Sequence, residues 1–360
     1  MTGPALAVDL LALTEQLCAV PSESLHETAL ADLVEARLRE RASGLRVDRQ
    51  GDNVVVRTEL GREQRVVLGG HLDTVPANGN ERPRRADDVV HGLGAADMKG
   101  GLAVLLALAE ALHRAPESAR FDATLVFYAA EEIAEEHNGL RELFAERPAW
   151  VAGDLAVLLE PTGAWVEAGC QGTLHVRATF RGARAHSARP WTGVNAIHRL
   201  ADVLARIAAH EADTVDLDGL AYRESLQVVG IEGGVANNVV PDQASLLVNR
   251  RFAPCYSVEE ATLQVRALLA GADEIEVVNA SPAAPPNLWD PLVAELIGTF
   301  DLGVRPKLGW TDVARFAAVG VPALNFGPGD PAISHTADEH VTRASLESCY
   351  AVLGRFLGVA

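Results

Sequence analysis

Short apolar runs alternate with segments of helical periodicity in the first part of this 360-residue chain. The runs are rich in valine, leucine and alanine and predict buried strands; they lie at 54–56, 66–68, 123–130 and 155–159. Apolar residues recur at helical spacing over 10–20, 30–38 and 102–113. Strands that alternate with helices predict an α/β domain. Before the second helix, Ser24-Leu25-His26-Glu27 has the sequence of a capping box.

The pattern changes near Cys170. Residues 173–180 alternate between apolar and polar side chains, which is typical of an antiparallel strand with one exposed face. Further strands are predicted at 225–231, 244–252 and 274–278, and helices at 195–210 and 258–269. The proline-rich segment 281–286 precedes a strand at 323–326 and a helix at 343–357. We therefore expect an α/β domain over 1–171 and 283–360, interrupted by an α+β domain over 172–282.

Composition narrows the class of protein. The formal net charge of -18 disfavours nucleic acid and anionic membranes as partners. No apolar run is long enough to span a bilayer, and the N-terminal segment lacks the basic region of a signal peptide. The four cysteines show no CxxC spacing, which suits a reducing compartment. These features predict a cytoplasmic protein, but the net charge says little about its substrate, because an acidic surface can surround a locally basic pocket.

Polar residues with metal-binding chemistry follow three of the predicted strands. They are His71 and Asp73, Glu131 and Glu132, and Glu160. Asp97 lies in a glycine-rich loop directly before a helix. Each of these residues alone is compatible with an ordinary surface charge, but ligands in α/β folds bind where strands end. A mixed set of imidazole and carboxylate donors suits zinc and, less selectively, manganese or cobalt.

Several motifs resemble those of the co-catalytic zinc amidohydrolases, a family that includes succinyl-diaminopimelate desuccinylases, acetylornithine deacetylases, aminoacylases and related carboxypeptidases. The similar segments lie at 70–76, 92–101, 131–132, 160–162, 181–187, 233–241, 309–316 and 326–330, followed by His335. They occur in the family's order along almost the whole chain. The resemblance implies a zinc-aminopeptidase-like catalytic domain with an inserted, ferredoxin-like α+β domain over 172–282 that acts as a lid and forms a homodimer.

The resemblance also implies a role for each candidate metal ligand. Asp97 would bridge two Zn²⁺ ions, for which Co²⁺ or Mn²⁺ are possible substitutes. His71 and Glu160 would complete the ligands of one ion, and Glu132 and His335 those of the other. Two catalytic residues follow in the same way: Asp73 would orient His71, and Glu131 would be the general base. Similar enzymes often have a cis peptide bond after the bridging aspartate, here between Asp97 and Met98.

Further residues are assigned by the resemblance to the substrate. His186 would reach the site of a neighbouring subunit and stabilise the tetrahedral oxyanion; the alternative is a loop histidine without a role. The expected substrate contacts are Asn237, Arg251, Thr311 and Arg315. Arg251 offers a planar fork to a carboxylate, whereas Arg315 either does the same or pairs with Asp312.

The activity implied is hydrolysis of N-succinyl-LL-2,6-diaminopimelate to succinate and LL-2,6-diaminopimelate, a step of lysine and diaminopimelate biosynthesis. The nearest alternative is an acetylornithine deacetylase or another N-acyl amino acid amidohydrolase. A non-catalytic metal-holding protein is a third possibility, but it would not need a base such as Glu131. The arginine-rich segment 81–85 departs from the tryptophan-containing segment of many relatives, so the chemistry is better defined than the substrate.

Overall fold

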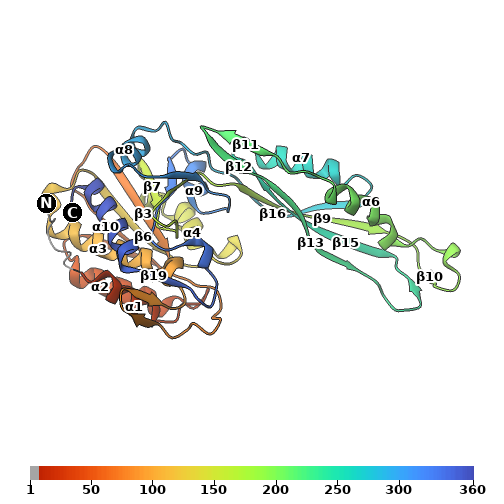
Figure 1. The fold of residues 1–360 in the computed structure, drawn as a ribbon, viewed down its shortest axis with the longest axis horizontal. Helices are drawn as coiled ribbons and strands as arrows, with labels where there is room; N and C mark the ends of the chain where they lie inside the picture. Colours follow the sequence, from red (N-terminus) through yellow and green to blue (C-terminus); the bar gives the residue numbers. More distant parts are fainter. Residues whose placement is uncertain (1–7) are drawn as a thin grey trace. The chain divides into compact units, whose positions relative to one another are not determined.

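The computed structural model describes residues 8–360, which form two compact units (Figure 1). The first unit comprises the chain up to Ala168 together with Asn287–Arg305 and Arg315–Ala360. The second comprises Gly169–Pro286 and the short segment Pro306–Ala314. No helix within residues 8–360 is long and apolar enough to cross a membrane.

The first unit is built on an eight-stranded mixed sheet. In spatial order its strands are β1 (Arg46–Gln50), β2 (Asn53–Arg57), β6 (Asp122–Tyr128), β3 (Arg65–His71), β7 (Leu155–Leu158), β18 (Ala323–Asn325), β8 (Val166–Ala168) and β17 (Val304–Pro306). The central strands β6, β3, β7 and β18 run parallel to one another. Their side chains are almost all buried, which explains why the sequence shows continuous apolar runs here rather than alternation.

Helices pack around this sheet. They are α1 (Leu10–Cys18), α2 (Thr28–Arg41), α3 (Gly100–Arg114), α4 (Gly139–Glu146), α5 (Pro148–Val151), α8 (Pro291–Phe300), α9 (Val313–Ala318) and α10 (Arg343–Leu357). Every residue of α3 up to Leu112 is buried, as expected for a helix that is apolar on all sides. It packs against α1, α2 and α10, and Figure 1 shows α3 beside α10. The predicted capping box is wrong: α2 begins at Thr28, and no side chain caps it.

Smaller elements complete the first unit. A three-stranded sheet joins β4 (Arg84–Ala86), β5 (Val89–His91) and β19 (His340–Thr342). Short helical turns lie at η1 (Ala95–Lys99), η2 (Pro116–Ser118), η3 (Glu135–His137) and η5 (Pro331–Ile333). The cis peptide bond expected between Asp97 and Met98 is present in η1.

The second unit has a four-stranded antiparallel sheet in the order β13 (Ser225–Gly233), β15 (Gln243–Phe252), β9 (Gly172–Arg181) and β16 (Glu274–Ser281). Helices α6 (Ala196–Ala208) and α7 (Val258–Leu268) run along it and share one apolar core with it (Figure 1). The chain order β9-α6-β13-β15-α7-β16 confirms the predicted ferredoxin-like topology. Two small antiparallel sheets and a short turn add to this unit. The sheets pair β10 (Ala185–His186) with β14 (Val239–Val240) and β11 (Thr214–Leu217) with β12 (Leu220–Arg223), and the turn is η4 (Pro190–Thr192).

Candidate metal centre

The carboxyl ends of three neighbouring parallel strands bring polar residues to one edge of the large sheet. Strand β3 ends at His71, β6 ends just before Glu131 and Glu132, and β7 ends just before Glu160. Because β3 pairs with both β6 and β7, these side chains emerge side by side. The sheet topology thus accounts for the convergence of residues that are far apart in the sequence.

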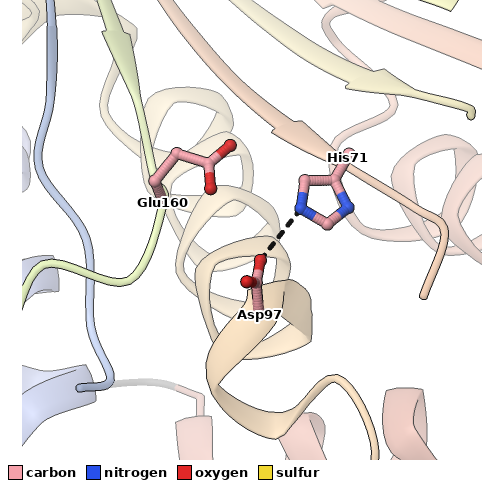
Figure 2. Close-up of side chains that lie close together, drawn as sticks. All are labelled: His71, Asp97 and Glu160. Carbon is pink, nitrogen blue, oxygen red and sulfur yellow. Dashed lines mark hydrogen bonds and ion pairs between the residues drawn. The ribbon is translucent and has the colours of Figure 1, made fainter. Parts of the chain in front are cut away.

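One group of donors surrounds His71. Its Nε2 lies 3.0 Å from Oδ1 of Asp97, and one ligand atom each of His71, Asp97 and Glu160 lie within 4.8 Å of one another. Figure 2 shows the imidazole and the Glu160 carboxylate turned toward the region of Asp97 from separate elements. The side chains of His71 and Glu160 are buried, and that of Asp97 is 12% exposed. This first cluster therefore offers one nitrogen and two carboxylate donors in a protected place.

A second group of donors shares Asp97 with the first. One ligand atom each of Asp97, Glu132 and His335 lie within 4.8 Å of one another. His335 Nε2 lies 2.9 Å from Glu132 Oε1 and 3.5 Å from Oδ2 of Asp97. The two oxygens of Asp97 thus face different histidines, which is the arrangement that a carboxylate bridging two cations requires. The donor set of these two clusters fits two divalent ions that accept nitrogen and oxygen ligands.

The Asp73 carboxylate binds the backbone of the segment that carries Glu131 and Glu132. Its Oδ1 accepts a hydrogen bond from the backbone N–H of Glu131 (2.9 Å), and its Oδ2 accepts one from that of Glu132 (3.0 Å). The Ser24 hydroxyl donates to Oδ2 at 2.7 Å. His71 Nδ1 is closer to the backbone carbonyl of Asp73 (3.0 Å) than to its Oδ1 (3.5 Å). The Asp73 carboxylate therefore fixes the Glu131–Glu132 backbone as well as standing next to His71.

The pKa shifts reflect this concentration of charge. Burial by itself would raise the pKa of Asp73, but its hydrogen bond to His71 and the other donors outweigh burial and lower this pKa to about 2. Burial opposes protonation of His71, yet hydrogen bonds to Asp73 and Asp97 raise its pKa above the usual value. The hydrogen bond to Glu132 is the main reason why the pKa of His335 rises to about 9. A divalent cation would compete with these protons for the two histidines.

Three buried or half-buried groups around the clusters were not identified from the sequence. Ser24 donates to Asp73, as described above, and the Glu27 carboxylate accepts the backbone N–H of Ala130 at 3.0 Å. Glu339 accepts backbone N–H groups beside Asp97. The serine and Glu27 had the spacing of a helix cap, and no local pattern marks Glu339. Their roles depend on contacts between distant segments, which the sequence pattern does not encode.

The residues expected to contact the substrate fall in both units. Arg315 belongs to the first unit, where its Nη1 lies 3.2 Å from Glu135 Oε1. The other residues belong to the second unit and are described there: His186, Asn237, Arg251 and Thr311. His186 is exposed on β10, and its Nδ1 accepts the N–H of Ala188 at 3.0 Å.

The remaining three differ in exposure. Asn237 is exposed between β13 and β14, and Thr311 is buried, with its backbone carbonyl accepting the thiol of Cys170. Arg251 is half-buried on β15, where burial lowers the pKa of its guanidinium. It lines a pocket of about 620 Å³ within the second unit, together with Gln171 and Arg223 among others.

Known proteins resemble this chain over nearly its full length. A Mycobacterium tuberculosis protein provisionally named succinyl-diaminopimelate desuccinylase DapE is 49% identical over 97% of this chain and 98% of its own. The Corynebacterium glutamicum protein named succinyl-diaminopimelate desuccinylase is 44% identical over 99% of this chain and 98% of its own.

Solved structures share the fold at low sequence identity. The aminopeptidase PepT from Bacillus cereus aligns with a TM-score of 0.78 at 19% identity, covering 97% of both chains. The YxeP protein of Bacillus subtilis, described as a dinuclear metal binding peptidase from the M20 family, aligns with a TM-score of 0.71 at 13% identity, also covering 97% of both chains. Residues 67–358 match the sequence profile of Peptidase family M20/M25/M40. The chain therefore belongs to peptidase family M20/M25/M40, a family of metal-dependent hydrolases.

Proposed function

We propose that this protein hydrolyses N-succinyl-LL-2,6-diaminopimelate to succinate and LL-2,6-diaminopimelate, as a step of lysine and diaminopimelate biosynthesis in the cytoplasm. The substrate is suggested by two relatives named for this activity, each matched over nearly the whole of both chains. The chemistry is supported by a single feature of the structure: Asp97 is shared by two clusters of metal-type donors that lie beside Glu131.

The proposed cofactor is a pair of Zn²⁺ ions, with Co²⁺ or Mn²⁺ as possible substitutes. His71 and Glu160 would hold one ion and Glu132 and His335 the other, with Asp97 between them. Such ions, when bound, polarise an amide carbonyl and lower the pKa of a water molecule. The donor chemistry of both clusters supports this assignment.

Glu131 is the proposed general base. A donor atom of Glu131 lies within 4.8 Å of donor atoms of His71 and Glu132, and its backbone is held by Asp73. Its carboxylate would take a proton from the attacking water as the water oxygen bonds to the amide carbon. The same carboxylate would then give that proton to the amine nitrogen as the C–N bond breaks. One residue thus serves as base and acid within one turnover.

The second unit is proposed to supply substrate contacts and the homodimer interface. Half-buried Arg251 lines a pocket that also contains Arg223, which supports recognition of a substrate carboxylate. His186, Asn237 and Thr311, with Arg315 of the first unit, remain proposed contacts. Strand β13 is an edge strand with exposed apolar side chains, including Val229 and Ile231, which supports pairing with a second copy.

The direct test is the rate of succinate release from N-succinyl-LL-2,6-diaminopimelate by zinc-loaded protein, with N-acetylornithine in a parallel reaction and a chelator-treated sample as the blank. We expect metal-dependent turnover of the succinyl compound alone. Turnover of N-acetylornithine alone would contradict the proposed substrate but would be consistent with metal-dependent amide hydrolysis. No turnover of either compound by protein with two bound ions would contradict the proposed activity.

A further inference from the structure

Glu339 is a buried carboxylate outside the proposed ligand set. Glu339 is only 1% exposed and lies four positions after His335, directly before β19. Its Oε1 accepts hydrogen bonds from the backbone N–H groups of Ala96 and Asp97, each at 3.0 Å. The carboxylate is therefore attached to the backbone of the residue that both donor clusters share.

The main chain of Glu339 strengthens the same connection. Its carbonyl accepts the N–H of Gly92 at 3.0 Å, and its own N–H donates to the carbonyl of Thr336. Asn80 forms a parallel link, because its side-chain amide donates to the Thr336 carbonyl and its backbone carbonyl accepts the N–H of Leu93. The loop that carries Asp97 and the loop that carries His335 are thus joined by several hydrogen bonds.

This connection bears on the second cluster more than on the first. His71 lies on a strand in the middle of the buried sheet, and its side chain is 1% exposed. His335 lies outside any regular element, its side chain is 48% exposed, and its backbone φ of 64° is uncommon for a residue other than glycine. The distance between Asp97 and His335 therefore depends on what holds their two loops together.

We propose that Glu339 is a positioning residue for the metal centre, which holds the Asp97 backbone at the spacing from His335 that the second ion requires. The inference rests on the proposed two-metal site and adds to it a residue outside the two donor clusters. Substitution of a residue that orients a metal ligand through a hydrogen bond typically lowers metal affinity by about 10- to 100-fold.

Three substitutions separate hydrogen-bond geometry from charge. E339A removes the carboxylate, and E339D keeps the charge but draws it back by about 1.5 Å, the length of one C–C bond. E339Q removes the charge but keeps an oxygen that accepts the two N–H groups. If Glu339 acts by positioning, E339A and E339D should lower the affinity for the second ion. E339Q should bind the second ion with an affinity closer to that of the unsubstituted protein.

Asp122 provides a matched control. It is also buried and also accepts two backbone N–H groups, those of Leu60 and Arg62, in addition to the Thr58 hydroxyl. It stands at the first residue of β6, the end of the strand away from Glu131. D122A therefore removes a comparable set of hydrogen bonds from the first unit without touching the loops of the donor clusters.

The experiment is a calorimetric titration of metal-free protein with Zn²⁺, together with thermal unfolding in the presence of a chelator. We expect two ions in the unsubstituted protein and in D122A. In E339D and E339A we expect the second ion to bind at least about tenfold more weakly. E339D also carries the test if E339A does not fold.

Two results would overturn the inference. In the first, E339D binds both ions within about twofold of the unsubstituted affinity while melting at a lower temperature, as D122A does, so that Glu339 only stabilises the fold. In the second, E339Q loses at least about tenfold in affinity for the second ion while E339D retains its affinity, so that charge and not position is responsible. An unsubstituted protein that binds no zinc would instead contradict the proposed metal centre itself.

Discussion

The two donor clusters share Asp97 but are built from different parts of the fold. The first takes His71 from the last residue of β3 and Glu160 from just after the adjacent parallel strand β7, and both side chains are buried. The second takes Glu132 and His335 from loops, and the His335 side chain is 48% exposed. Strand-borne donors are fixed by the sheet itself, whereas loop-borne donors depend on added hydrogen bonds. We therefore expect the first cluster to bind its ion more tightly than the second.

The largest expected effect separates catalysis from metal binding in both clusters. The substitution Glu131→Gln keeps the size and the backbone N–H bond to Asp73 but removes the basic carboxylate. We expect kcat to fall by roughly 100- to 10,000-fold, the usual contribution of a general base, while both ions remain bound. Turnover close to that of the unsubstituted protein, with unchanged zinc content, would show that Glu131 is not the base.

The difference between the clusters is tested by removing one histidine at a time. His335→Ala should lower the affinity for one ion by more than about 100-fold and leave the other ion tightly bound. This loss is larger than that expected for residues that only orient the metal ligands. His71→Ala should instead lower the affinity for the ion that binds more tightly. Zinc titrations of the two variants, analysed together, measure this. If each variant lowered the affinity for both ions equally, the two clusters would not differ in how tightly they bind their ions.

A smaller effect is expected from the support of Asp73. Ser24→Ala removes the hydroxyl that donates to Asp73 Oδ2, and leaves the bonds to the backbone of Glu131 and Glu132. We expect kcat to fall by about tenfold, in line with the loss of one hydrogen bond to a charged group. Ser118→Ala, which removes an exposed hydroxyl that donates to the Ala115 carbonyl, is the control. Equal rates for the two variants would rule out the support role.

The smallest effect concerns the metal-free protein. The pKa of His335 is raised from 6.5 to about 9, so its protonated form stabilises the fold below pH 6.5, and this contribution is lost as the pH rises through 9. Because His335 is half-exposed, we expect the melting temperature to fall by at most about 2 °C across this range. His335→Gln should remove this part of the pH dependence. A melting temperature that rises with pH, by an amount that His335→Gln abolishes, would contradict the assignment.

The sequence predicted those site residues that follow a regular element. His71, Glu131 and Glu160 stand at the ends of apolar runs, and the rule that ligands bind at strand ends was enough to bring them together. His335 follows no strand and came only from the family resemblance. The α+β unit was also predicted, because its strands and helices are long and strongly patterned, whereas its ferredoxin-like topology came from the family resemblance.

What the sequence did not reveal depends on contacts between distant segments. Ser24 and Glu27 were read as a helix cap, although Ser24 bonds to Asp73 and Glu27 to Ala130. Glu339 bonds to Asp97, 242 positions away. Strands such as β8 and β19 have three residues each, too few to show a period. In each case the local pattern is either absent or typical of something else, and tertiary contacts decide the outcome.

The central claim is that two ions share Asp97. It is tested most directly by anomalous diffraction at the zinc absorption edge from crystals of the zinc-loaded protein. The account predicts two peaks about 3.5–4 Å apart, one on the side of His71 and one on the side of His335, with an Asp97 oxygen next to each. A single peak, or two peaks of which one does not contact Asp97, would contradict it.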